Sequence, residues 1–201
     1  MRIGIDFDNT IACYDGVFHA AAIERALIPA DLPDDKNSVR DYLNGQGRND
    51  EFTELQGYVY GSRMDLASVY PGFQDFVRAA RAAGHEVSIV SHKTRFPILG
   101  ARHDMHLAAR NFLEQRGLAG AGPQCVASDN VFFELTKEAK VARIAALGCQ
   151  VFIDDLPEIF SLPGFPAETR GILFDPQDRH AKISIERYPD WRGVRSAVIG
   201  A

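Results

Sequence analysis

Five short apolar runs, separated by stretches with helical spacing, restrict the folds available to this chain more than any other feature. Each run is too short for a core helix and is apolar on both sides, as in strands covered on both faces. The runs are Arg2–Ile5, Glu86–Val90, Gln124–Ala127, Gln150–Ile153 and Gly171–Phe174. Helical spacing is found over Gly72–Ala83, about 103–116 and Lys137–Leu147. Strands that alternate with helices predict a parallel sheet and therefore an α/β fold.

The stretch 14–67 interrupts this alternation. It contains no apolar strand run and is rich in polar residues, glycine and aromatic residues. Val17–Leu27 has helical spacing, and a second helix is predicted around Glu51–Tyr60. We therefore expect residues 14–67 to form a small helical insert, and residues 1–13 and 68–201 to form the core that carries the sheet.

Charge and composition narrow the classes of partner. A formal net charge of -5 offers no basic surface for a phosphate backbone, so nucleic acid is not expected as a partner. No segment has the length needed to span a bilayer, and the chain turns acidic at Asp6 before a signal-length apolar stretch develops, so we expect no membrane partner. Cys13, Cys125 and Cys149 lie in or beside apolar runs without metal-ligand spacing, which favours a reducing cytoplasm. The sequence does not determine the oligomeric state.

Polar residues gather at the carboxyl ends of the predicted strands. In an open parallel sheet these ends share one edge, and ligand sites lie there. The residues are Asp6, Asp8 and Thr10 after the first run, Ser91, His92 and Lys93 after the second, Asp154 and Asp155 after the fourth, and Lys137 at the start of the helix before the fourth. We therefore expect these side chains to form one site.

The residue types indicate a site for a metal ion and a phosphate group. Asp6 and Asp8 would repel each other unless a cation or a proton intervened, and Mg²⁺ prefers carboxylate oxygens. Acidic residues also form turns at strand ends, so the Asp-x-Asp pair alone does not separate the two interpretations. Ser91 offers a hydroxyl and Lys137 a cation to phosphate oxygens. Taken alone, Ser91 is also typical of a strand end or helix cap, and Lys137 of a solvated lysine in a first helical turn. Because a cation near a helix N-terminus opposes the macrodipole, Lys137 gains nothing locally, which is consistent with an anionic ligand.

In chain order, these pieces resemble the four motifs of the haloacid-dehalogenase-like (HAD) superfamily. Ile3–Thr10 is similar to the first motif and Ser88–Ser91 to the second. Lys137, within Leu135–Glu138, is similar to the third, and Val151–Asp155 to the fourth. The resemblance implies a Rossmann-like parallel sheet core, with residues 14–67 as an inserted helical cap that selects the substrate.

The resemblance also implies an activity, a Mg²⁺-dependent phosphohydrolase acting on a small phosphorylated metabolite such as a sugar phosphate or nucleotide. Asp6 would be the nucleophile that forms an aspartyl-phosphate, and Asp8 the general acid and base. The remaining roles would be phosphate binding by Ser91 and Lys137, and Mg²⁺ ligation by Asp6, Asp8 through its backbone carbonyl, and Asp154 or Asp155, of which Asp155 is favoured. Thr10, His92 and Lys93 are further candidates for substrate binding. The cationic stretch that starts at His92 either holds a second anionic group of the substrate or is simply solvated. Asp8 favours phosphoryl transfer over dehalogenation, because a leaving halide needs no proton.

Two other functions stay open from the sequence. A phosphomutase or phosphotransferase would use the same aspartyl-phosphate, and a non-catalytic module that binds a phosphorylated ligand would keep the pocket alone. Within the insert, the candidates for substrate specificity are His19, Arg40, Tyr58, Tyr60 and Arg63.

Overall fold

The computed structural model describes residues 1–200, which divide into two compact units. The sheet unit comprises Met1–Ala12, Val69–Lys93 and the residues from Leu113 onward. The helical unit comprises Cys13–Ser68 and Thr94–Phe112. The expected insert, residues 14–67, therefore lies within the helical unit, which also takes in a second segment that follows the second expected strand.

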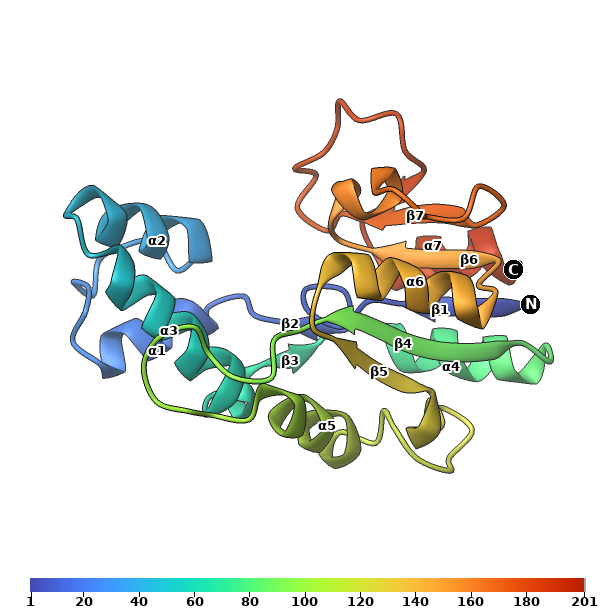
Figure 1. Cartoon of the computed structure of the whole chain (residues 1–201), viewed down its shortest axis with the longest axis horizontal. Helices are drawn as coiled ribbons and strands as arrows, with labels where there is room; N and C mark the ends of the chain where they lie inside the picture. Colours follow the sequence, from blue (N-terminus) through green and yellow to red (C-terminus); the bar gives the residue numbers. More distant parts are fainter. Residues whose placement is uncertain (201) are drawn as a thin grey trace. The chain divides into compact units, whose positions relative to one another are not determined.

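The sheet unit is built on six strands that pair in parallel, which confirms the predicted α/β class (Figure 1). The strands, in their order across the sheet, are β5 (Val131–Glu134), β4 (Glu86–His92), β1 (Arg2–Ile5), β6 (Val151–Asp154), β7 (Arg170–Phe174) and β8 (Arg187–Tyr188). The first strand of the chain thus lies between β4 and β6. Because β4 and β6 lie on opposite sides of β1, the strand order reverses at β1, and this is where parallel sheets bind ligands.

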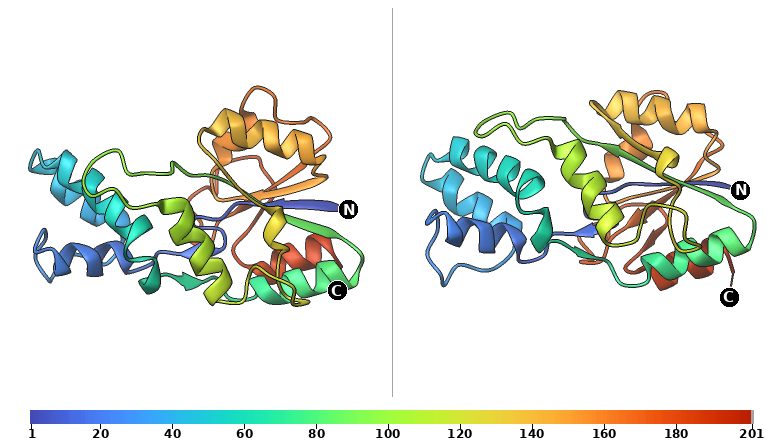
Figure 2. Two further views of the ribbon diagram at one scale, coloured as in Figure 1. Left: turned by 60° about the horizontal axis from the view of Figure 1, so that its bottom comes forward. Right: turned by 90° about the horizontal axis from the view of Figure 1, so that it is seen from below.

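Helices cover both faces of the sheet, which explains why the strands are apolar on both sides. On one face, α6 (Lys137–Leu147) buries Val141 and Ile144 against Val90 and Phe152. On the other face lie α4 (Phe73–Ala82) and α7 (Trp191–Val198), as the two views of Figure 2 show. The fully buried ring of Trp191 lies 5.0–5.4 Å from those of Phe73, Phe76 and Phe174, measured between ring centroids.

The helical unit packs three helices around its own apolar core. They are α1 (Val17–Glu24), α2 (Lys36–Gly45) and α3 (Asn49–Gly61), and the unit also holds most of α5 (Met105–Gln115) and a short turn, η1 (Met64–Leu66). Asp35 starts α2, because its carboxylate accepts hydrogen bonds from the backbone N–H groups of Asn37 and Ser38. The core includes Phe18, Val39, Leu43, Leu55 and Val59, each fully buried.

Two short strands lie where the chain passes between the units. They are β2 (Ala12–Cys13) and β3 (Ser68–Val69), which pair in a sheet of their own. In residues 1–200, no helix combines the length and the apolar character needed to cross a membrane.

One predicted strand was wrong, and several boundaries differ. Residues 124–127 form a loop in which Val126 makes an isolated bridge with Ala119, and the strand beside β4 is β5 instead. Cys125 and Val126 are buried residues of this loop, so their apolar character reflects packing and not a place in the sheet. The strand predicted to end at Val90 continues to His92, which puts Ser91 and His92 inside β4. The segment after Asp175, for which the sequence predicted no element, supplies β8 and α7.

Candidate active site

The carboxyl ends of β4, β1 and β6 bring the expected acidic residues together. Asp6 directly follows β1, and its backbone N–H donates to the carbonyl of Ile153 on β6, at 2.9 Å. The chain then turns tightly, since the N–H groups of Ile11 and Ala12 both donate to the carbonyl of Phe7, at 3.0 and 2.9 Å. Asn9 adopts a left-handed conformation in this turn, with φ at 57°. This turn places Asp8 at the same edge of the sheet as Asp6.

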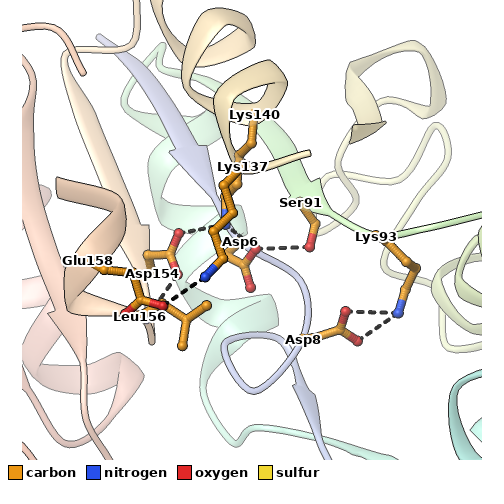
Figure 3. A network of polar contacts seen from close by, with 9 residues as sticks. All are labelled: Asp6, Asp8, Ser91, Lys93, Lys137, Lys140, Asp154, Leu156 and Glu158. Atoms are coloured by element: carbon orange, nitrogen blue, oxygen red, sulfur yellow. Dashed lines mark hydrogen bonds and ion pairs between the residues drawn. The ribbon is translucent and has the colours of Figure 1, made fainter. Parts of the chain in front are cut away.

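One oxygen of Asp6 carries two hydrogen bonds. Its Oδ1 accepts from Ser91 Oγ at 2.9 Å and from Lys140 Nζ at 2.6 Å (Figure 3). Lys140 also donates to Asp154 Oδ2 at 2.6 Å, so one buried ammonium group joins two buried carboxylates. The second oxygen of Asp6, Oδ2, accepts no hydrogen bond from the residues that the structure describes.

Asp154 is fixed from both sides, whereas Asp155 is not. Asp154 is fully buried, and its Oδ1 accepts the backbone N–H of Leu156 at 3.0 Å. Asp155 remains partly exposed and makes no hydrogen bond or ion pair with residues 1–200 through its side chain. Carboxylate oxygens of Asp6, Asp154 and Asp155 lie within 4.8 Å of one another.

The charges of this cluster do not balance. Burial lowers the pKa of Lys140, but the charges of Asp154 and Asp6 outweigh it and hold that pKa above its ordinary value. Burial also raises the pKa of Asp154 to about 7, with a further rise from Asp6 that Lys140 opposes. Burial, followed by the charges of Asp6 and Asp154, raises the pKa of Asp155 well above its ordinary value. The pKa values of the lysine and of the two carboxylates all rise, because the cluster holds three carboxylates and only one ammonium group.

Asp8 is held apart from this cluster by a different lysine. Lys93 Nζ donates to both carboxylate oxygens of Asp8, at 3.0 and 2.8 Å, and its side chain is 3% exposed. The same ammonium lies 5.6 Å from the ring centroid of Phe7. In Figure 3, Asp8 accordingly points toward Lys93 and away from Asp6.

The other expected substrate-binding residues have separate surroundings. Lys137 pairs with Glu158 at 2.9 Å, and both side chains are well exposed. His92 is partly buried, and burial together with the charge of Lys140 lowers its pKa. Thr10 is fully buried, its hydroxyl makes no hydrogen bond within residues 1–200, and its carbonyl accepts from Trp191 Nε1 at 3.1 Å. The structure therefore offers no support for substrate contact by Thr10.

The sequence matches no protein-family model and no curated protein. Solved structures, in contrast, match over almost the entire chain. A HAD-superfamily hydrolase from Ehrlichia chaffeensis has 14% sequence identity and a TM-score of 0.57, covering 98% of this chain and 94% of its own. A HAD phosphatase from Thermococcus onnurineus has 15% identity and a TM-score of 0.53, covering 99% and 98%. A structure described as a dehalogenase has 11% identity and a TM-score of 0.56, covering 98% and 96%.

The chain has the HAD-like fold. This confirms the fold that the resemblance implied, with its Rossmann-like core. Because both a phosphatase and a dehalogenase share the HAD-like fold with this chain, the fold alone does not select between their reactions.

Within the HAD-like fold, the lysine beside Asp6 is Lys140 and not the expected Lys137. Both residues lie on the side of α6 that faces the sheet, but Lys140 is one turn further in, about 4.5 Å along the helix axis. The sequence predicted Lys137, because it lies in the first turn of the helix, where a cation could also face a phosphate group, and Lys140 was not considered. The signal was a lysine beside Val141 and Ile144 on the buried side of a helix, where an ammonium group needs an acidic partner.

The candidate specificity residues of the insert do not form one group. Tyr58 donates to Glu24 at 2.9 Å, and Arg63 pairs with the same carboxylate. Tyr60 accepts from Lys36 at 3.0 Å. Arg40 on α2 pairs with its neighbour Asp41, and His19 on α1 has a buried Nε2 without a hydrogen bond in the described part of the chain.

Proposed function

We propose that this protein is a Mg²⁺-dependent phosphohydrolase that acts on a small phosphorylated metabolite through an aspartyl-phosphate on Asp6. One observation carries the proposal: a buried carboxylate at the central strand end, held through a single oxygen by Ser91 and Lys140, with a second aspartate two residues on. The phosphatase from Thermococcus onnurineus, which has this fold, adds support at the level of the fold.

The first half-reaction transfers the phosphoryl group to Asp6. Oδ2 of Asp6 attacks phosphorus while the bond between phosphorus and the leaving oxygen breaks, and Asp8 gives that oxygen a proton. Ser91 and Lys140 keep Oδ1 in place, which leaves Oδ2 for the substrate. Lys140 also offers its positive charge to the phosphoryl oxygens as they approach.

The second half-reaction frees the enzyme. Asp8, now a carboxylate, takes a proton from a water molecule whose oxygen attacks phosphorus, and the bond between phosphorus and Asp6 breaks. Inorganic phosphate leaves and Asp8 is protonated again. Dehalogenation would not need this proton transfer, so Asp8 favours the phosphatase over the dehalogenase among the enzymes that share the fold.

The residues present fit a magnesium ion. Asp6, Asp154 and Asp155 bring three carboxylates together against one ammonium group. Burial and the neighbouring carboxylates raise the pKa values of Asp154 and Asp155, so a bound cation would stabilise their charged forms. We propose Asp6, the backbone carbonyl of Asp8, and Asp155 as ligands. Asp155 is preferred to Asp154 because both carboxylate oxygens of Asp154 already accept hydrogen bonds, from Lys140 and from Leu156. Bound Mg²⁺ neutralises charge on the transferring phosphoryl group.

We further propose that residues 14–67 act as a cap that selects a small substrate and restricts water at the site. Three buried cysteines, all free thiols, fit a reducing compartment such as the cytoplasm. A cap that favours small molecules and a net charge of -5 both speak against nucleic acid as substrate.

The test is phosphate release from an aryl phosphate by purified protein, with and without Mg²⁺. We expect activity that requires the metal and is lost in Asp6→Asn and Asp8→Asn but kept in Asp75→Asn, a surface control whose ion pair with Arg78 is exposed. A panel of sugar phosphates, nucleotides and short phosphorylated acids then identifies the substrate.

The alternatives give different results in the same experiment. A phosphomutase or phosphotransferase would act only after a bisphosphorylated activator or a second acceptor is added. A binding module would shift its melting temperature with phosphorylated ligands and release no phosphate. Full activity of Asp6→Asn would overturn the assignment of the nucleophile.

A further inference from the structure

The helical unit contains a cavity of about 370 Å³ whose residues have no part in the proposed phosphoryl transfer. Three segments line it: the end of α1, the middle of α3, and the loop before α5. The lining residues include Glu24, Arg25, Glu54, Tyr58, Gly100 and His103. All of them belong to the helical unit.

One face of α3 packs closely against the loop before α5, which forms part of the cavity wall. Glu54, Gly57, Tyr58 and Gly61 follow one another at the spacing of a single helix face. A Cβ atom at Gly57 would lie 2.5 Å from Cβ of Pro97, and one at Gly61 would collide with His103. The two glycines therefore let the loop lie directly on α3, while Glu54 and Tyr58 of the same face remain to line the cavity.

Contacts among the lining residues hold the cavity in shape. Tyr58 donates to Glu24 Oε1 at 2.9 Å, and Arg63 pairs with the other oxygen of Glu24. His103 Nδ1 lies 2.9 Å from Ser62 Oγ. The guanidinium carbon of Arg25 lies 5.3 Å from the ring centroid of Tyr58, within the range of a cation–π contact.

Two charged groups at the cavity keep unused hydrogen-bonding capacity. Arg25 Nη2 and Glu54 Oε2 are 3.6 Å apart, which is longer than a hydrogen bond. Neither side chain makes a hydrogen bond with any residue from 1 to 200. A planar donor group and a carboxylate therefore lie side by side, and their side chains are 36% and 40% exposed.

The charges around the cavity cancel. Glu24 is balanced by Arg63, and Glu54 by Arg25. A ligand with a net positive or negative charge would meet a like charge beside its partner. A ligand that carries both charges, close together, would satisfy both Arg25 and Glu54.

We propose that this cavity binds a small zwitterion of the α-amino-acid type with an aromatic side chain. The ligand's carboxylate accepts hydrogen bonds from the fork of Arg25, and its ammonium group donates to Glu54. Its ring packs beside Tyr58 and His103, whose own ring centroids are 6.3 Å apart. The cavity shares no residue with the proposed phosphohydrolase site, and binding there does not depend on that activity.

The test is isothermal titration of the full-length protein with L-phenylalanine as probe. Two analogues serve as matched ligand controls: 3-phenylpropionate lacks the ammonium group, and phenethylamine lacks the carboxylate. We expect L-phenylalanine to bind with a dissociation constant at or below about 1 mM, and each analogue to bind about tenfold more weakly or not at all.

Variants locate the binding. Arg25→Met and Glu54→Gln should each weaken binding of L-phenylalanine by about tenfold, since each removes one charge-assisted partner. Arg40→Met is the control, because Arg40 also forms an exposed ion pair in the helical unit but lies outside the cavity. Circular dichroism establishes that each variant is folded. Absence of binding at about 10 mM probe, or equal binding by the analogues or by both cavity variants, would overturn the proposal.

Discussion

Lys93 donates hydrogen bonds to both carboxylate oxygens of Asp8, at 3.0 and 2.8 Å, from a position that is almost fully buried. Two bonds from one ammonium group define where the Asp8 carboxylate lies. The backbone N–H of Lys93 donates in turn to the carbonyl of Glu134 at 2.8 Å, so β5 holds Lys93 in place. The sequence predicted that Lys93 binds the substrate, whereas in the structure its ammonium group forms an ion pair with Asp8.

Replacing Lys93 should therefore impair the chemical step more than substrate binding. In Lys93→Met, Asp8 loses its anchor, and a misplacement on the order of 1 Å can cost about 100-fold in rate. We expect kcat to fall by about 10- to 100-fold while KM changes by less than about threefold, and Lys93→Arg to keep part of the activity. Steady-state kinetics with an aryl phosphate measure both constants. A raised KM with an unchanged kcat would instead show that Lys93 binds the substrate.

Lys140 and Lys137 form a matched pair for a stability measurement. Removing the ammonium group in Lys140→Met leaves Asp6 and Asp154 buried without it, which should lower the free energy of unfolding by about 3–5 kcal/mol. Lys137→Met breaks a well-exposed ion pair with Glu158 and should cost at most about 1 kcal/mol. Urea denaturation at pH 7 without metal compares the two. Equal effects would contradict the placement of Lys140 at the carboxylates.

Asp155→Asn should have opposite effects with and without magnesium. Without metal, the substitution removes a charge that burial, Asp6 and Asp154 all disfavour, so the melting temperature should rise. With Mg²⁺, wild type should gain stability through ligand binding, and the variant should gain little. Thermal unfolding in a chelator and in excess Mg²⁺ gives both values. If Asp154→Asn, and not Asp155→Asn, abolishes the magnesium effect, Asp154 is the ligand.

His92 should remain uncharged at neutral pH. Burial and the charge of Lys140 lower its pKa in the folded protein, so below the ordinary value the unfolded chain binds more protons than the folded one. The contribution of His92 to stability is therefore complete above its ordinary pKa near 6.5 and is lost as pH falls from that value through the lowered pKa of the folded protein. An NMR titration of the imidazole resonances, with His92→Gln to assign the signal, should show protonation of His92 below pH 6.5. A higher value would contradict the predicted direction.

The parallel sheet was predictable because strands buried on both faces must be apolar throughout, as Ile3, Ile5 and Ile153 are. The same rule gave a wrong strand at 124–127, where Cys125 and Val126 are buried within a loop. Val131, Phe132 and Phe133 make up most of the true strand, and their β-branched and aromatic character is typical of strands. Apolar character alone does not distinguish these two cases.

Within the site, the positions that follow strand ends were predictable, because backbone geometry places them. Asp6 and Asp154 come together for this reason. The partner of each side chain depends on distance along a helix and on rotamers, which a sequence does not contain. For this reason the sequence did not predict that Lys140, and not Lys137, contacts Asp6. It also did not predict that Lys93 pairs with Asp8.

The division of the chain between the two units has a consequence for synthesis on the ribosome. The helical unit lies entirely within residues 13–112, so all of its parts emerge before β6, the neighbour of β1 at residues 151–154. During that interval β1 lacks one of its two partners, and Asp6 lacks Asp154 beside it. A nascent chain that ends before residue 155 therefore carries a complete helical unit but no assembled acidic cluster, and the proposed activity can arise only late in translation.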